Sequence, residues 1–312
     1  MNRRNLLHAA LGAPALSLTG ILTPALGQSH GSEDTFRFAF LSDTHIRPEG
    51  GADRACAMCF EQISASNCDF AIHGGDHIED ALGVDRERAT MLMDLYQRTE
   101  RAHLRKTVHH VIGNHDCLGV FAESGISPDA PDYGKAFYAA HFGARFYAFD
   151  HKGVHFVVLD SIGLTDDHNY EARIDEDQLA WLQADLARQP EGQRVIVVTH
   201  IPLVTALGCY EPVSWLNTPH NWTFVVNGRE VLRILQDYNV IAVLQGHSHV
   251  FEQITLNGLH FISPGAVAGA DWQGSFLGTP EGYCEITVTG EDVRVSFHTY
   301  GFDVPDRQDV RI

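Results

Sequence analysis

The residues best suited to chemistry in this chain are two pairs of metal-ligand side chains, each pair separated by one residue. Asp43 and His45 follow the apolar run FRFAFL, and His247 and His249 follow the apolar run NVIAVLQ and one glycine. In an extended segment, residues at i and i+2 point to the same side of the backbone. Each pair could therefore bind one cation through two side chains.

Three other apolar runs end in the same way. Asp76 follows FAIH and two glycines, Asn114 follows HHVI and one glycine, and His200 follows RVIVVT. Glycine lacks a Cβ atom, so it allows a sharp turn out of a strand and a close approach of the backbone to a bound ion. Chance placement of single residues does not explain five apolar runs that all end in ligand-type residues. We therefore predict that these five ends meet at one metal site.

Most histidines need no such role in a chain that has 19 of them. A single His is usually a hydrogen-bonded residue of the core or the surface, and an Asp after a strand is often a helix N-cap. We interpret five other histidines in this ordinary way: His73, His109, His110, His151 and His155.

The candidate ligands lie where short strands buried on both faces would end, because each apolar run is rich in Val, Ile or Phe. Between these runs, apolar residues recur at helical spacing over residues 53–65, 85–104, 175–188 and 228–238. Alternating strands and helices predict an α/β fold. Hairpin turns in the middle and C-terminal parts predict a second, mixed sheet; they lie at Lys152-Gly153, Asn257-Gly258 and Gly290-Glu291. The sequence therefore predicts two sheets packed face to face, with helices outside.

The composition favours a globular protein that acts on a small molecule. Hydrophobic residues make up 44% and aromatic residues 10% of the 312 residues, enough for a substantial core. The formal net charge of -18 repels phosphate backbones, so we do not expect nucleic acid as a partner. A small anionic substrate needs a local positive centre, which bound cations can provide. The sequence predicts no particular oligomeric state.

Residues 1–27 are interpreted as an export signal. Arg3 and Arg4 precede an apolar stretch, and the small residues Ala25 and Gly27 resemble a signal-peptidase site. The arginine pair favours the twin-arginine route, which predicts a periplasmic protein. A short amphipathic helix or a membrane anchor is the alternative for this segment.

We expect a polar linker over residues 28–35 and a single domain over residues 36–312. No later apolar run is long enough to span a membrane. Cys56-x-x-Cys59 is weak evidence for a zinc site, because an amphipathic helix that buries both thiols explains the spacing equally well.

Together, these motifs resemble the signature of the calcineurin-like metallophosphoesterase superfamily, in its usual order. The resemblance runs from residue 36 to about residue 265 and rests on five blocks: Asp43-x-His45, Gly75-Asp76, Gly113-Asn114-His115-Asp116, His200 and Gly246-His247-x-His249. It implies a four-layer αββα sandwich, in which two mixed β-sheets are flanked by helices. This architecture agrees with the two sheets expected above.

The resemblance also implies which residues bind two metal ions, with Asp76 bridging them. One ion would be bound by Asp43, His45, Asp76 and His249. The other would be bound by Asp76, Asn114, His200 and His247. These ligands supply oxygen and imidazole nitrogen without thiolate, which suits two divalent or trivalent ions of Fe, Mn or Zn.

Such a centre predicts hydrolysis of a phosphodiester or a phosphomonoester. Two cations about 3.5 to 4 Å apart can hold a hydroxide between them and neutralise charge during its in-line attack on phosphorus. His115 would handle the proton of the leaving oxygen or the charge of the phosphate. We expect Asp116 to orient and charge His115 by accepting its other N–H. Asp116 could instead be the N-cap of the following segment.

Two other functions are weighed against this hydrolase. A catalytically silent metal-binding module could have the same fold, but an inactive protein would tolerate the loss of the ligands and of His115. A mononuclear metallohydrolase of another fold would contain about one metal ion per chain instead of two.

Glu79 and Asp80 bear on the class of phosphoesterase. Glu79 stands three residues after Asp76, where purple acid phosphatases have a metal-binding Tyr, so that class is disfavoured. The two acids look more similar to the class that includes cyclic nucleotide phosphodiesterases and broad phosphohydrolases. They could also be solvated, or accept a hydrogen bond from a ligand His.

Substrate choice should depend on three loops that follow the ligands, at residues 117–134, 203–221 and 266–283. The last two contain no Lys or Arg, so we see no clamp for a second phosphate. Aromatic residues in or directly beside these segments could stack on a base, cover an acyl chain or simply pack. They are Phe121, Tyr133, Tyr210, Trp215, Trp222, Trp272 and Phe276.

Overall fold

Two mixed β-sheets form the centre of the structure, a computed structural model that describes residues 35–209 and 220–311. Across the first sheet, the strands are β13 (Asp292–His298), β12 (Tyr283–Thr289), β1 (Thr35–Leu41), β2 (Phe70–His73) and β3 (Val108–His110). Across the second, they are β10 (Phe251–Leu256), β11 (Leu259–Pro264), β9 (Asn239–Gln245), β8 (Arg194–Thr199), β5 (Val154–Val158) and β4 (Tyr147–His151). A separate hairpin is formed by β6 (Ile162–Thr165) and β7 (Asn169–Ala172).

Within each sheet, the strands that precede the candidate ligands are parallel to one another. β1, β2 and β3 are parallel in the first sheet, and β5, β8 and β9 are parallel in the second. Antiparallel pairs such as β1–β12 and β4–β5 make both sheets mixed. Because parallel neighbours end at the same edge of a sheet, the loops after β1, β2 and β3 meet, as do those after β8 and β9.

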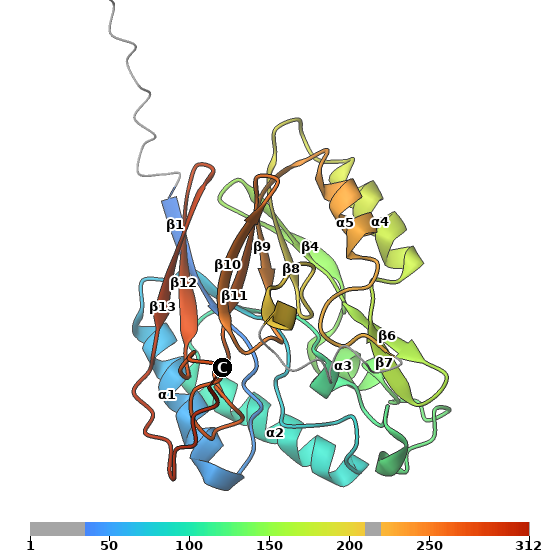
Figure 1. Cartoon of the computed structure of the whole chain (residues 1–312), viewed down its shortest axis with the longest axis vertical. Helices are drawn as coiled ribbons and strands as arrows, with labels where there is room; N and C mark the ends of the chain where they lie inside the picture. The colour runs from blue at the N-terminus through green and yellow to red at the C-terminus, as the bar shows by residue number, and fades with distance from the viewer. Residues whose placement is uncertain (1–34, 210–219, 312) are drawn as a thin grey trace, which may run out of the picture. The chain divides into compact units, whose positions relative to one another are not determined.

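Helices cover the outer face of each sheet. α1 (Ala52–Ala65) and α2 (Arg86–His103) pack on the first sheet, where Leu92 of α2 shares a buried cluster with Leu41 of β1. α4 (Glu176–Leu186) and α5 (Gly228–Leu235) pack on the second sheet, where Leu182 of α4 shares a cluster with Val197 of β8. Figure 1 shows α4 and α5 together on one flank and α1 and α2 on the other.

A third buried cluster lies between the two sheets and completes the four layers. Phe38 of β1, Phe156 of β5 and Leu244 of β9 belong to it. Side chains alternate along each strand, so Leu41 faces the helices while Phe40 faces the opposite sheet. This alternation explains why the strands are apolar on both faces, and it confirms the predicted αββα sandwich.

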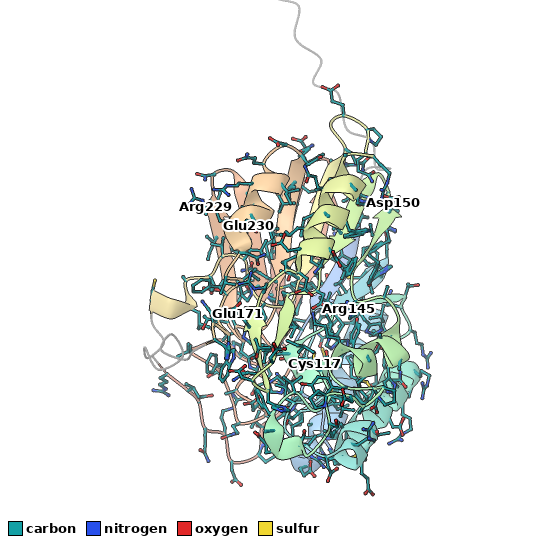
Figure 2. The ribbon with its side chains drawn as sticks, turned by 90° about the vertical axis from the view of Figure 1, so that its right-hand side faces the viewer. Cys117, Arg145, Asp150, Glu171, Arg229 and Glu230 are labelled. Atoms are coloured by element: carbon teal, nitrogen blue, oxygen red, sulfur yellow. The ribbon has the colours of Figure 1, made fainter. Side chains whose placement is uncertain are left out.

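Two features of the fold differ from what the sequence predicted. The hairpin β12–β13 joins the first sheet through β1, so the expectation that the hairpins build the second sheet was wrong for this one. Hairpin β6–β7 and α3 (Lys135–Phe142) were not predicted. These elements are short, so they carry too few residues for the sequence to show a clear strand or helix periodicity. Figure 2 shows where the hairpin lies: Glu171 on β7 and Cys117 are below Arg229 and Glu230 of α5.

The two cysteines of the C-x-x-C motif lie on α1 and are buried and unpaired. Burial raises the pKa of the Cys59 thiol, which disfavours the thiolate that binds zinc. The structure therefore favours the amphipathic-helix interpretation of Cys56 and Cys59.

The predicted export signal lies outside the described residues, as does the linker except for its last residue, where β1 already begins. The signal and the domain boundary therefore stay predictions. Among residues 35–209 and 220–311, no helix combines the length and the apolar character that a membrane span requires.

His109 should make stability depend on pH. Its ring lies parallel to that of Phe149, with the ring centroids 3.5 Å apart, and burial lowers the pKa of His109 to about 4. The unfolded value is about 6.5. The stability that the buried, neutral ring of His109 contributes is therefore present above pH 6.5 and is lost as the pH falls through about 4. Urea titrations measure the unfolding free energy, which should fall less over this pH range in His109→Phe than in the unmodified chain. An equal fall in both chains would contradict the prediction.

Candidate metal centre

The loops after five strands, β1, β2, β3, β8 and β9, bring the candidate ligands together. Backbone hydrogen bonds join these loops: the N–H of Asp43 donates to the carbonyl of Gly75 at 2.9 Å, and that of Gly246 donates to His200 at 2.8 Å. The loops of the first sheet supply Asp43, His45, Asp76 and Asn114, and those of the second supply His200, His247 and His249. Seven residues far apart in sequence thus lie at one edge of the sandwich.

The first group of ligands surrounds one candidate metal position. Nε2 of His45 lies 3.1 Å from Nε2 of His249 and 3.6 Å from Oδ2 of Asp76. Oδ1 of Asp43 lies 3.5 Å from Nε2 of His249. Atoms spaced in this way can all contact one cation that lies about 2.0 to 2.2 Å from each of them.

The second group surrounds a neighbouring position. Nε2 of His200 lies 3.1 Å from Oδ1 of Asn114 and 3.2 Å from Oδ2 of Asp76. Ligand atoms of Asp76, His200 and His247 all lie within 4.8 Å of one another. Because Asp76 belongs to both groups, its carboxylate could bridge two cations.

The orientation of two imidazole rings fits metal binding. Nδ1 of His200 donates to the carbonyl of Gly74, and Nδ1 of His249 donates to that of Gly269, both at 2.7 Å. Since a carbonyl oxygen only accepts, Nδ1 of each ring carries a proton, and Nε2 faces the other ligands and can bind a cation once its own proton is lost. The donor set and its geometry therefore fit two metal ions.

Burial and the charges of neighbouring groups determine the pKa values of these side chains. Burial alone would raise the pKa of Asp76, but the positive charge of His200 outweighs it and holds that pKa well below its usual value. Burial, reinforced by the charge of His200, lowers the pKa of His247 to about 3. His247 is therefore neutral at pH 7 and has a free lone pair for a cation.

Most of the candidate ligands have a strained backbone. Five of the seven have positive φ: Asp43 (56°), His45 (37°), Asp76 (55°), His247 (67°) and His249 (56°). This left-handed region costs free energy for residues other than glycine and is typical of functional sites. The two i, i+2 pairs are therefore not extended, as the sequence argument assumed. The left-handed conformation, and not an extended one, directs both side chains of each pair toward the other candidate ligands.

Gly113 is required by the packing around Asp76. A Cβ atom on residue 113 would overlap the carboxylate and the backbone nitrogen of Asp76. Gly113→Ala should therefore displace Asp76, lower the metal content and cost about 1 to 3 kcal/mol of unfolding free energy. Elemental analysis and urea denaturation measure the two effects. Gly228→Ala is the control, because its Cβ would meet only ordinary contacts from 3.5 Å; equal behaviour of the two variants would contradict the prediction.

His115 lies beside both groups of ligands, and its partner is Asp80. Nδ1 of His115 lies 3.4 Å from Oδ1 of Asp80, and 32% of the His115 side chain is exposed. Burial opposes the charged ring, but the carboxylates of Asp76 and Asp80 outweigh it and raise the pKa of His115 to about 10. Cations bound to Asp76 would oppose this shift.

The predicted contact between Asp116 and His115 was wrong. Oδ2 of Asp116 instead accepts from Nδ1 of His77 at 2.8 Å and from the backbone N–H of Gly113 at 2.9 Å. The same carboxylate accepts from the N–H of Asp76 and of His77. Asp116 therefore ties the loop after β2 to the loop after β3. Its place within a short 3-10 turn also excludes the N-cap alternative.

Two residues of this region were not assigned by the sequence argument. Asp80 was noted as an acid but not as the partner of His115, and His77 was missed. His77 also bonds to His110, whose Nδ1 lies 3.0 Å from its Nε2. No sequence signal marks such pairs, because His77 and Asp116 are 39 positions apart. Glu79 pairs with Arg47 at 2.8 Å and Arg88 at 2.6 Å, so it is neither a ligand nor simply solvated.

Two cavities open beside the centre. One has a volume of about 520 Å³ and is lined by His45, Asp76, His115 and His249, together with the polar side chain of Arg47. The other has a volume of about 570 Å³ and also includes His115. The candidate ligands are therefore accessible to a small molecule.

Comparison with known proteins places this site in a family. A model of the calcineurin-like phosphoesterase family matches residues 36–251, and no curated protein sequence matches the chain. A dimetal phosphatase from Danio rerio is similar in structure, with a TM-score of 0.59 at 15% identity over 85% of this chain and 96% of that one. GAP50, described as the anchor in the inner membrane complex of Plasmodium, has a TM-score of 0.55 at 19% identity over 86% of each chain. These structures share the fold, and the family model covers most of the sequence: the chain belongs to the calcineurin-like phosphoesterase family.

Proposed function

We propose that this protein is a dinuclear metal-dependent hydrolase of small phosphoesters. The observation that carries the proposal is the convergence of seven oxygen and imidazole ligands into two groups that share Asp76. Two cations bound there would supply a nucleophile at neutral pH and polarise the phosphoryl oxygens. Fe, Mn and Zn suit this donor set, because it contains no thiolate.

The chain's own residues would hold the substrate and handle the proton. Asn114 contributes an uncharged oxygen next to His200, so it adds no repulsion toward an anionic phosphate. His115 is within ion-pair distance of Asp80 and lines both cavities, which places it beside a phosphoryl group bound at the centre. A protonated His115 could neutralise phosphate charge or donate its proton to the leaving oxygen. Asp80 would keep the ring charged and oriented.

A metal-dependent assay tests this function against its alternatives. The purified chain should contain two metal ions and hydrolyse 4-nitrophenyl phosphate or bis(4-nitrophenyl) phosphate. Removal of the metals by a chelator should abolish turnover, and Mn, Fe or Zn should restore it. Two bound ions without turnover on any phosphomonoester or phosphodiester would indicate a silent metal-binding module. Full activity with a single ion would indicate a mononuclear enzyme.

A further inference from the structure

One cavity beside the metal centre has a wall of aromatic rings. This cavity, of about 570 Å³, shares His115 and His247 with the centre, and its lining also contains Phe121, Tyr170 and Trp222. We call these three residues the aromatic shelf. Tyr170 is buried, while Phe121 and Trp222 are partly exposed, so the latter two rings are the ones accessible from the cavity.

The three rings pack against one another in a compact cluster, in which the planes of Phe121 and Trp222 differ by 40° with centroids 6.3 Å apart. The planes of Tyr170 and Trp222 differ by 18° with centroids 5.6 Å apart, and those of Phe121 and Tyr170 differ by 24° with centroids 6.2 Å apart. The indole of Trp222 is fixed, because its Nε1 donates to the carbonyl of Tyr170 at 3.0 Å and to Oδ1 of Asn169 at 3.2 Å. A ligand would therefore meet preordered rings, which lowers the entropy cost of binding.

The charges around the shelf define what it can accept. Apart from His115 and His247, the charged side chains among the described residues of this cavity are Asp80 and Glu123, both acidic. A second phosphate would be repelled here. By contrast, the other cavity contains Arg47, Ser248 and Gln273 and is the more polar of the two. The organic group of a bound phosphoester would therefore contact apolar surface in the cavity that contains the aromatic shelf.

We propose that the aromatic shelf binds a flat, uncharged ring system in the organic group of the substrate, such as a nucleobase. The inference rests on the proposed function and specifies its substrate class. The partly exposed rings of Phe121 and Trp222 each offer an aromatic surface on which a planar partner can stack. A quaternary ammonium group needs rings on several sides. Asp80 and Glu123 could accept hydrogen bonds from amino groups at the edge of such a ring.

Binding of adenosine tests the shelf independently of hydrolysis. Adenosine carries a flat amino-substituted ring and no phosphate, so isothermal titration measures the shelf whether or not the protein turns over a phosphoester. The intact chain should bind it, and Trp222→Leu should weaken binding about tenfold or more. Phe121→Leu, a second variant, should also weaken it, whereas Trp222→Phe should retain most of the affinity. Trp181→Leu, on α4, is the matched control and should bind adenosine as the intact chain does.

Kinetics provide the second arm of the test. Trp222→Leu should raise KM for 1-naphthyl phosphate about tenfold while KM for ethyl phosphate changes little. Failure of adenosine to bind an intact chain that hydrolyses 4-nitrophenyl esters would overturn the shelf and leave the proposed function standing. Tighter binding of choline or hexanol than of adenosine would overturn the flat-ring assignment. Adenosine binding that depends on Trp222 in a chain without turnover would support the shelf alone.

Discussion

Replacing Asp76 with Asn is expected to reduce hydrolysis about a thousandfold or more and to lower the metal content below two ions per chain. Oδ2 of Asp76 lies 3.6 Å from Nε2 of His45 and 3.2 Å from Nε2 of His200, so one carboxylate serves both groups of ligands. The Asn amide keeps the size of Asp but offers one oxygen and no negative charge. It therefore cannot hold two cations at once.

Asp166→Asn is the matched control for this variant. Asp166 is exposed between β6 and β7, so the same chemical change there should leave metal content and turnover unaltered. Elemental analysis and an assay with bis(4-nitrophenyl) phosphate measure both effects. Wild-type turnover by Asp76→Asn with two bound ions would refute the bridging role.

Replacing His115 with Gln should lower kcat for an alkyl phosphoester about a hundredfold to ten-thousandfold while two metal ions remain bound. His115 is not one of the seven predicted ligands, and it lines both cavities beside them. If its role is to protonate the leaving oxygen, the loss should be much smaller for 4-nitrophenyl esters, because 4-nitrophenolate leaves without a proton. The ratio of the two losses therefore reports the function of the ring.

Asp80→Asn should show the same pattern on a smaller scale, about tenfold, since Asp80 would act on an alkyl ester through His115. Equal losses of His115→Gln on both kinds of ester would mean that His115 neutralises phosphate charge instead of donating a proton. Unchanged kcat on both would remove His115 from the mechanism.

The sequence predicted the αββα sandwich and the residues that meet at its edge, because both depend on local patterns. Each ligand follows an apolar strand, and parallel strands end at one edge of a sheet, so Asp43 and His200 converge once the strands are recognised. The glycines before the ligands were also informative. Gly113 allows the close approach to Asp76 that the structure requires.

The errors concern contacts between residues that are distant in sequence. Asp116 follows His115 directly, so a local argument pairs them, but neighbouring side chains on a tight turn point in different directions. Its carboxylate contacts His77 and the loop after β2, and His115 contacts Asp80. The left-handed backbone at the ligands was likewise not predictable, because only the surrounding packing holds a non-glycine residue in that region.

The distribution of the ligands between the two sheets has a consequence for stability. His249 joins Asp43, His45 and Asp76 of the first sheet, and His200 and His247 join Asp76 and Asn114, so each cation would link the two sheets. An ion that binds only the folded chain adds about 2.7 kcal/mol of stability at a hundred times its Kd. Removal of the metal ions would then lower the stability of the fold as well as abolish the proposed hydrolysis.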